Sequence, residues 1–330
     1  MITIKDVAKL ARVSITSASY ALNGTGTISA ATRKRVLEAA AELNYHPNAF
    51  ARHLKTRKTR TVGVFITRFG GSFYEEILEG IHDAVLKTDY ELLVCPESRG
   101  VRKMLAHRQV DGAIIFDTKI KSDLLIRLAS KSFPIIVLDR NLETEHALSL
   151  LVDNPHGARQ AFDHLYDQGA RRISFISGAY DSYDNSERMH AFVSAADEHH
   201  VNVHSYAGNF TEESGYEAAQ VIYHQEHPLP EAVFCANDQM AIGLIRFLKE
   251  HHIQVPGDIA VIGFDDISLA KFLQPSLSSI RVSRFLWGSM AATQLIDFLE
   301  NENPFKSARI PVELVLRESS ILSARLSERD

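Results

Sequence analysis

Cysteine is nearly absent from the sequence, and long apolar runs do not occur. The 330 residues include two cysteines, Cys95 and Cys235, each within an apolar strand-like stretch, which indicates reduced core thiols and excludes a disulfide framework. No stretch reaches the roughly 18 consecutive apolar residues of a membrane-spanning helix. The N-terminal MITIKDVAKLARV carries charges where a secretory signal has its apolar run. We therefore expect a cytoplasmic protein that does not enter a membrane.

Sequence signatures of common cofactor and catalytic sites are missing as well. No GxGxxG motif follows the first strand-like run, and neither a Walker A sequence nor a GxSxG nucleophile elbow occurs. The chain has fifteen histidines, but the adjacent pairs at 199–200 and 251–252 cannot place both rings on one helix face and have no clear third ligand. We therefore predict no catalytic residues, no cofactor and no metal site.

Basic residues are concentrated at the start of the chain. Residues 1–60 contain eleven Lys and Arg against three Asp and Glu, a formal charge of +8, and the net charge of −5 leaves −13 for the rest. A basic segment joined to an acidic body indicates a polyanion as the partner of the first segment and a different task for the second. A basic surface that is merely solvated would give the same charge difference, so the sequence motifs are needed to distinguish the two interpretations.

Residues 1–46 carry the signals of three short helices. Thr3, Ser14 and Ser29 each stand where a side chain caps a helix N-terminus, and NGTG ends the second helix. The inward faces repeat at three- and four-residue spacing and consist of Ile4, Val7, Ala8 and Ala11, then Ala18, Ala21 and Leu22, then Val36, Ala39, Ala40 and Leu43. Two short helices joined by a turn, with a supporting third helix, predict a small all-α helix-turn-helix domain that places its second helix in the DNA major groove.

The sequence strings of this segment sharpen that assignment. This segment closely resembles the LacI/GalR family of bacterial transcription regulators. The resemblance rests on the strings TIKDVAKLARVS, SYALNG, ISAATRKRVLEAAAELNYHPN and ARHLKTRKTRTVGV. Two departures are visible, because Arg12 follows the first helix where glycine is usual, and Ser-Ala-Ser-Tyr at 17–20 replaces the common Thr-Val-Ser-Arg. The resemblance extends over nearly the whole chain.

The resemblance implies separate roles on operator DNA. Base edges are read by Ile15, Thr16 and Tyr20, at the exposed start and middle of the second helix. Because Tyr20 replaces a bidentate arginine, we expect a different operator from that of relatives with arginine there. Phosphate contacts, which fix register without reading sequence, are expected from Ser14, Asn23, Ser29, Arg33 and Arg35. The alternative for the basic cluster at 33–35 is a solvated helix face.

Residues 47–60 form the predicted hinge helix and linker. Pro47 suits the first position of a helix of about two turns, which is marginal in water by itself and so is expected to fold on docking. The resemblance implies that two such helices of a homodimer pair over the operator centre, where Leu54 and Lys55 contact the minor groove. In the alternative, Leu54 covers part of the body.

From residue 61 onward, apolar strand-like runs alternate with helical stretches. Continuous apolar runs such as TVGVFIT, VDGAIIFD and DIAVIGFDD predict parallel sheets covered on both faces. The resemblance implies a two-lobed, periplasmic-binding-protein-like α/β domain over 61–330, with a first lobe from about 61–153 and 284–310 and a second from about 154–283 and 311–330. The segment CPESRGVRKMLAHRQVDG is short, so we expect the helix within it to be truncated or reshaped.

Ligands of parallel sheets bind beyond the C-terminal ends of the strands. Those ends combine carboxylates, an amide, hydroxyls and aromatic rings, which suit a polyhydroxylated molecule. The resemblance assigns effector contacts to Phe73, Tyr74, Asp139, Arg188, Phe210, Asn237 and Asp265, and the strand-end position adds Thr118. Helix capping is the alternative for Asp265 and for Asp238. The sequence RFGGS at 68–72 departs from the Asn-Pro that the family often has before its aromatics.

These features predict a homodimeric, effector-responsive repressor of carbohydrate-utilisation genes that a sugar inducer releases from double-stranded operator DNA. The chain stops after SARLSERD without a heptad-repeat helix, which favours a dimer over a tetramer. Three alternatives stay open. One is a regulator of the same family with a purine corepressor or a phosphoprotein partner, another is a sugar-binding protein without gene control, and the third is a sugar-acting enzyme that uses Asp139 and Asp265 as its acid–base pair.

Overall fold

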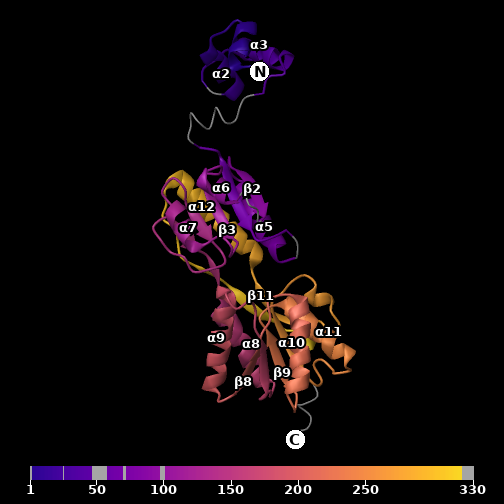
Figure 1. The fold of residues 1–330 in the computed structure, drawn as a ribbon. Helices are drawn as coiled ribbons and strands as arrows, with labels where there is room; N and C mark the ends of the chain where they lie inside the picture. The colour runs from indigo at the N-terminus through magenta and orange to yellow at the C-terminus, as the bar shows by residue number, and fades with distance from the viewer. Residues whose placement is uncertain (1, 25, 47–57, 70–71, 97–100, 322–330) are drawn as a thin grey trace. The chain divides into compact units, whose positions relative to one another are not determined.

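The computed structural model describes residues 2–24, 26–46, 58–69, 72–96 and 101–321. The chain divides into two compact units, Met1–Thr59 and Arg60–Asp330, which are called the head and the body below (Figure 1). The predicted hinge residues Leu54 and Lys55 lie outside the described residues. Among the helices that are described, none has the length and apolar character needed to cross a membrane.

Three helices surround a small apolar core in the head. They are α1 (Ile4–Leu10), α2 (Ile15–Asn23) and α3 (Ala30–Glu42). The buried core residues are those that the three- and four-residue spacing predicts, namely Val7, Ala8, Ala11, Ala18, Ala21, Val36, Ala39 and Ala40. Small alanine side chains at these positions let short helices approach one another closely. The predicted helix-turn-helix domain is confirmed.

Serine side chains hold the N-termini of the second and third helices. The Ser14 hydroxyl accepts a hydrogen bond from the backbone N–H of Ser17 at 3.0 Å. The Ser29 hydroxyl accepts one from the backbone N–H of Thr32 at 3.2 Å. Each cap satisfies a backbone donor that the helix leaves free, which stabilises the helix by about 1 kcal/mol.

Two turns of the head pass through left-handed backbone conformations. Gly24 ends α2 at φ = +69°, which glycine adopts without strain, whereas Arg12 follows α1 at φ = +54°. A residue with a Cβ loses roughly 1–2 kcal/mol in this conformation. Glycine at the position of Arg12 would therefore relieve steric strain that this chain retains.

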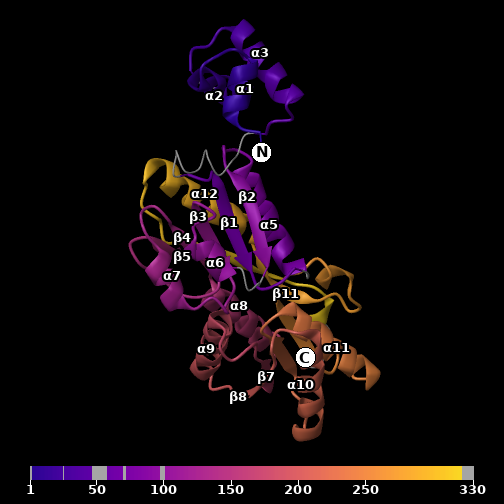
Figure 2. The ribbon, with the colours of Figure 1, turned by 45° about the horizontal axis from the view of Figure 1, so that its top comes forward.

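The first lobe of the body is built on a five-stranded parallel sheet in the order β2-β1-β3-β4-β5. Its strands are β1 (Thr61–Ile66), β2 (Glu91–Pro96), β3 (Gly112–Phe116), β4 (Ile135–Val137) and β5 (Ala147–Ser149). Helices α5 (Ser72–Val85) and α12 (Arg284–Asn301) pack on one face, and α6 (Val101–Ala106) and α7 (Ser122–Leu128) on the other (Figure 2). Helix α6 is short, as the sequence predicts for its segment.

The second lobe has a six-stranded sheet in the order β13-β11-β10-β9-β7-β8. All neighbouring strands are parallel except β13, which runs antiparallel to β11. The strands are β7 (Ile173–Ile176), β8 (Val203–Tyr206), β9 (Ala232–Cys235), β10 (Ala260–Asp265), β11 (Ser278–Val282) and β13 (Val312–Val315). Four helices pack against this sheet in two pairs. One pair is α8 (Asn154–Asp167) with α9 (Tyr183–Glu198), and the other is α10 (Glu212–Gln225) with α11 (Asp238–Glu250).

The chain passes between the lobes after β5, after β11 and again after α12. Two short strands, β6 (Leu151–Val152) and β12 (Arg309–Ile310), lie in the first and last of these connections and pair in parallel. Two 3₁₀ helices, Ala270–Phe272 and Glu318–Ser320, complete the second lobe. Because parallel strands of both lobes end towards the connections, their C-terminal residues converge on one region.

Candidate functional site

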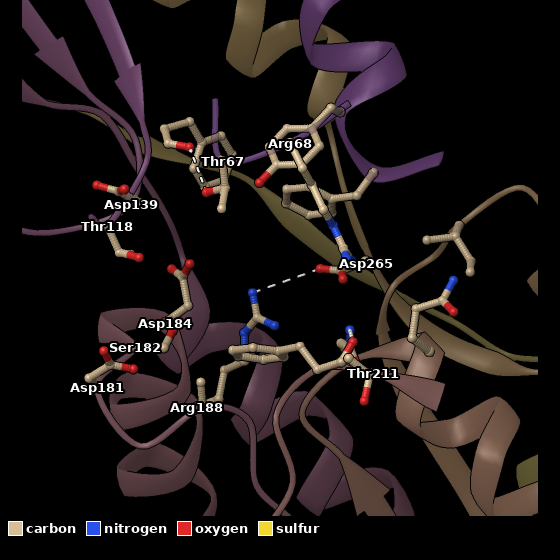
Figure 3. Close-up of a pocket in the computed structure, with 18 of the residues that line it drawn as sticks. Thr67, Arg68, Thr118, Asp139, Asp181, Ser182, Asp184, Arg188, Thr211 and Asp265 are labelled. Carbon is tan, nitrogen blue, oxygen red and sulfur yellow. Dashed lines mark hydrogen bonds and ion pairs between the residues drawn. The ribbon is translucent and has the colours of Figure 1, made fainter. Parts of the chain in front are cut away.

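A cavity of about 430 Å³ lies between the two lobes, which is within the size range of small-molecule sites (Figure 3). Its lining residues come from the strand ends and from the first turns of the following helices. They are Thr67, Arg68, Phe73, Tyr74, Phe116, Thr118, Asp139, Ala179, Asp181, Ser182, Asp184, Arg188, Phe210, Thr211, Glu212, Asn237, Gln239, Asp265 and Ile267. The structure thus brings every predicted effector residue to one cavity, from segments nearly two hundred residues apart.

Arg188 of α9 is 4% exposed, and its guanidinium is held on several sides. Its Nε donates to Asn154 Oδ1 at 2.8 Å, and its Nη1 donates to the backbone oxygen of Ala236 at 2.6 Å. The guanidinium lies 3.6 Å from the centroid of the Phe264 ring, and Nη2 is 3.8 Å from Asp265 Oδ1. These contacts fix the cation at the cavity wall, so a ligand meets a donor that is already oriented.

Asp265 presents a buried carboxylate whose hydrogen bonding is incomplete. Among the described residues, no donor forms a hydrogen bond to its Oδ1. Burial raises the pKa of Asp265 to about 6, although Arg188 and Arg284 oppose the shift. Arg284 Nη1 donates to the backbone oxygen of Asp265, and Arg284 Nη2 pairs with Glu76 of α5 at 2.7 Å. Because a buried acceptor without a donor is costly, a ligand hydroxyl at this position would be favourable.

Asn154 connects the cavity wall to the segments between the lobes. It is completely buried, and its Nδ2 donates to Asp184 Oδ1 at 2.8 Å and to Glu187 Oε2 at 3.2 Å, while its Oδ1 accepts from Arg188. Arg309 of β12 binds both carboxylate oxygens of Glu187, at 2.6 and 2.7 Å. Hydrogen bonds therefore run from the cavity to the β6–β12 pair.

Asp139 is tied to the residue that follows it. Its Oδ1 accepts from Arg140 Nε at 2.7 Å and its Oδ2 accepts from Arg140 Nη2 at 2.9 Å. Arg140 also donates to the backbone oxygens of Ile120 and Asp117, each at 2.6 Å. Burial raises the pKa of Asp139. The carboxylate is therefore an acceptor of fixed orientation at the cavity edge.

Asn237 has a structural role in addition to its place in the lining. It caps α11, because its Oδ1 accepts from the backbone N–H of Met240 at 3.0 Å. Asp238, which the sequence offers as an alternative cap, instead accepts from Ser279 Oγ at 2.6 Å and from the backbone N–H of Ile267 at 2.8 Å. Capping by Asp238 was therefore wrong, and the cap lies one residue earlier.

Phe210 forms one wall through an unusual backbone conformation. Its φ is +68°, and Asn237 Nδ2 donates to its backbone oxygen at 3.1 Å. The ring lies directly over Gly178, where an added Cβ would come within 2.1 Å of the ring. Glycine at 178 is thus required for the ring to reach this position.

The aromatic residues of the first lobe form a connected cluster. Phe73 and Tyr74, at the start of α5, pack edge-on against each other with centroids 5.5 Å apart, and both pack edge-on against Phe116 at 5.6 and 5.4 Å. Behind them, Trp287 of α12 lies 5.3 Å from Phe116 and donates to the backbone oxygen of Leu150 at 2.7 Å. Such a rigid apolar wall suits the flat face of a ring.

Sequence reasoning missed two features of this site. Asp184 was not predicted, although it precedes Arg188 by four residues and so lies on the same face of α9. Burial raises the pKa of Asp184. Asn154 was not predicted either, because its hydrogen-bond partners are about 30 residues away in sequence and no local sequence pattern identifies them.

In the head, the predicted base-reading residues are on the surface. Ile15, Thr16 and Tyr20 are exposed on α2, and the Tyr20 ring packs close to Gly26, where an added Cβ would lie 2.7 Å from it. Asn23 Nδ2 donates to the backbone oxygen of Ser19 at 2.9 Å. Tyr20 therefore presents part of its ring to solvent and uses part for packing.

The predicted phosphate contacts also lie on the outside of the head. Ser14, Asn23, Ser29 and Arg35 are exposed, and Arg33 is half-buried.

In the described part of the chain, no group of three or more His, Cys, Asp and Glu side chains is arranged to hold a metal ion. The described residues Cys95 and Cys235 form no disulfide bond, and burial raises the pKa of Cys235 well above its ordinary value.

Comparison with known proteins adds to this geometry. Residues 3–48 match the model for bacterial regulatory proteins of the lacI family, and residues 162–320 match that for a periplasmic binding protein-like domain. The HTH-type transcriptional repressor PurR of Pasteurella multocida (strain Pm70) is 34% identical over 331 residues, which cover 97% of this chain and 98% of the relative.

Solved structures give the same result. A sugar-binding transcriptional regulator from Enterococcus faecalis is 34% identical with a TM-score of 0.74, covering 80% of this chain and 98% of that one. The transcriptional regulator CelR, solved as a cellobiose complex, is 28% identical with a TM-score of 0.72, covering 97% of this chain and 100% of that one. The predicted fold class, a helix-turn-helix domain joined to a periplasmic-binding-protein-like α/β domain, is confirmed.

Proposed function

The chain belongs to the LacI family of bacterial regulatory proteins and is a transcriptional repressor, and from this premise we propose that a sugar bound in the body cavity releases it from operator DNA. One observation carries the proposal. Asp265 Oδ1 accepts no hydrogen bond from the described residues, and it lies beside the fixed guanidinium of Arg188. Carboxylate acceptors and an arginine donor match the hydroxyl groups of a sugar, and the aromatic cluster around Phe116 matches the apolar face of a sugar ring. The cellobiose bound by the similar regulator CelR supports this class of ligand.

The head supplies the DNA-binding surface in this proposal. Ile15, Thr16 and Tyr20 contact base edges in the major groove, and the phosphate contacts come from Ser14, Asn23, Ser29, Arg33 and Arg35. The protein acts as a homodimer, with Leu54 and Lys55 of the two hinge segments in the minor groove at the operator centre. A dimer presents two copies of the head, which matches the two half-sites of a palindromic operator.

The sugar acts through a difference in its affinity for two arrangements of the lobes. A ligand that satisfies Asp265 and Arg188 acts on groups with direct links to both lobes. Asp265 is joined through Arg284 to Glu76 on α5 of the first lobe. Arg188 is joined through Asn154 and Glu187 to the β6–β12 pair. These links are the physical route by which occupancy of the cavity changes the spacing of the linkers.

Binding without turnover is part of the proposal. An acid–base pair needs a carboxylate that is free to exchange a proton with the substrate. Both oxygens of Asp139 already accept hydrogen bonds from Arg140, so Asp139 is not free for the proton exchange that the enzyme alternative assigns to it. A bound sugar is therefore expected to be recovered unchanged.

A thermal-shift screen of the full-length protein tests the proposal. The ligands are mono-, di- and oligosaccharides together with purine bases and nucleosides, because a ligand that binds only the folded state raises the melting temperature by mass action. A sugar that raises it should also release the protein from operator DNA in a mobility-shift assay. A purine hit that strengthens operator binding, with no sugar hit, would contradict the proposal and favour corepression.

A further inference from the structure

Arg68 adds a positive charge to a cavity whose lining also includes the carboxylates of Asp181, Asp184 and Asp265. It follows β1 and lines the cavity from the first lobe, and in Figure 3 its side chain extends towards the side where Asp265 lies. None of the described residues forms a hydrogen bond or an ion pair with its guanidinium. The side chain is exposed, so water solvates the charge while the cavity is empty of ligand.

The other cations in and around the cavity have their partners within the protein. Arg140 binds both carboxylate oxygens of Asp139. Arg246 pairs with Glu212, another lining residue. Arg188, as described above, is held by hydrogen bonds, a ring contact and an ion pair. Arg68 differs from all of these because no hydrogen bond or ion pair within the described residues holds its guanidinium.

A ligand that fills the cavity removes water from Arg68. A guanidinium carries five N–H donors and no acceptor, and a desolvated cation without a counter-charge is costly. A hydroxyl oxygen of a neutral sugar offers one weak acceptor, whereas a carboxylate or phosphate accepts two charge-assisted hydrogen bonds in the planar geometry of the guanidinium. The charge of Arg68 therefore favours an anionic group on the ligand.

The second lobe lines the same cavity with carboxylates. Asp184 and Asp265 offer carboxylate oxygens, which accept hydrogen bonds when ionised and so require donors such as hydroxyl groups. The Oδ1 of Asp265 in particular lacks a donor within the described residues. A ligand that suits both lobes carries hydroxyls towards the second lobe and a negative charge towards the first.

Building on the proposed function, we propose that the effector is an acidic sugar, a polyhydroxylated ring or chain that bears a carboxylate or a phosphate, and that Arg68 binds its anionic group. Arg68 is then the residue that selects acidic sugars over neutral ones.

Calorimetric titration of the full-length protein tests this assignment. The probes are glucose and galactose, their uronic acids, gluconate, glucose 6-phosphate, glucosamine and inorganic phosphate. We expect at least one acidic sugar to bind roughly tenfold or more tightly than its neutral parent, the scale of one charge-assisted contact. Whether the uronic acids and gluconate or the sugar phosphate bind more tightly distinguishes a carboxylate from a phosphate.

Variants at position 68 show whether Arg68 is responsible. Arg68→Gln should lower the affinity for the acidic sugar to that of the neutral one and leave the neutral sugar within a few-fold. Arg68→Lys should keep part of the preference, because it retains the charge and loses the planar fork. Arg127→Gln, which removes an exposed arginine of α7 in the same lobe, is the matched control and should change neither affinity.

Several results would overturn the assignment while leaving a sugar-responsive repressor in place. These are a neutral sugar or glucosamine that binds as tightly as any acid, inorganic phosphate alone that binds as tightly as the sugar acid, or an Arg68→Gln variant that loses neutral and acidic sugars equally. A protein that binds none of the sugars, neutral or acidic, would instead contradict the proposed function itself, and the role of Arg68 with it.

Discussion

Arg12 shows how one residue can strain a turn without preventing the fold. Its φ of +54° places a Cβ where glycine is favoured. Arg12→Gly should stabilise the turn between α1 and α2 by about 1 kcal/mol, which raises amide-exchange protection in these helices roughly fivefold in the full-length protein. Arg12→Ala is the control, because it removes the side chain and keeps the Cβ. Equal protection in the two variants would contradict the steric explanation.

Asp265 gives the cavity a pH dependence whose sign follows from its raised pKa. A carboxyl with a folded-state pKa of about 6 and an ordinary value of 3.8 favours the fold fully below pH 3.8 and loses that contribution as the pH rises through 6. Asp265→Asn should therefore be more stable than the wild type at pH 8 by roughly 1–3 kcal/mol. The difference should shrink as the pH falls towards 4.

Urea unfolding of both proteins at several pH values measures this difference directly. Asp297→Asn serves as the comparison, because hydrogen bonds from Asn301 and Asn303 lower the pKa of the Asp297 carboxyl, so this variant should be less stable than the wild type at pH 8. A stability difference at Asp265 that does not change between pH 4 and 8 would contradict a raised pKa of Asp265 in the folded protein.

At the scale of secondary-structure elements, the contact between α5 and α12 depends on glycine. An added Cβ on Gly288 of α12 would lie 1.9 Å from the backbone oxygen of Ile77, and one on Gly80 of α5 would lie 2.1 Å from that of Phe285. Gly288→Ala should therefore destabilise the body by roughly 1–3 kcal/mol or more, since the helices have to separate. Chemical denaturation provides the measurement. Thr293→Ala, at an exposed position of the same helix, should change stability by less than about 0.5 kcal/mol.

The elements that the sequence predicted well are those with a simple apolar pattern. The head helices follow from the spacing of Val7, Ala18 and Val36 and their neighbours, and continuous apolar runs identify strands such as β1 and β10. Strand β11 was not predicted, because buried Ser278 and Ser279 interrupt its apolar pattern. Both serines can be buried because their hydroxyls have acceptors: Ser279 Oγ donates to Asp238 Oδ1 at 2.6 Å, and Ser278 Oγ donates to the backbone oxygen of Arg317 at 3.0 Å. Such partners are visible only after folding.

The same limit applies to the candidate site. Strand-end position and family resemblance together selected residues such as Arg188 and Asp265, which the fold then places at one cavity. Their hydrogen-bond partners, including Asn154 and Arg284, were beyond reach because they depend on side-chain positions set by distant segments. Capping by Asp238, which the sequence left open as an alternative, fails for the same reason, since Asp238 accepts hydrogen bonds from distant residues and Asn237 caps the helix.

At the scale of the whole molecule, charge separates the two tasks of the chain. The basic first 60 residues suit a nucleic acid, and the acidic remainder carries a cavity whose wall is hydrogen-bonded to the segments between the lobes. Allostery in this arrangement requires the ligand to prefer one arrangement of the lobes over the other. A residue that contacts the ligand and also the interlobe network should therefore control the response to the ligand without controlling DNA affinity.

The most direct test of the account is operator binding by the full-length protein as the sugar identified in the screen is titrated in. The wild type should dissociate from operator DNA as the cavity fills. Arg188→Ala should bind the operator within a few-fold of the wild type and fail to dissociate, while the control Arg127→Ala should behave as the wild type does. Release of Arg188→Ala at the wild-type sugar concentration, or a bound sugar that leaves wild-type operator binding unchanged, would contradict control of the repressor through this cavity.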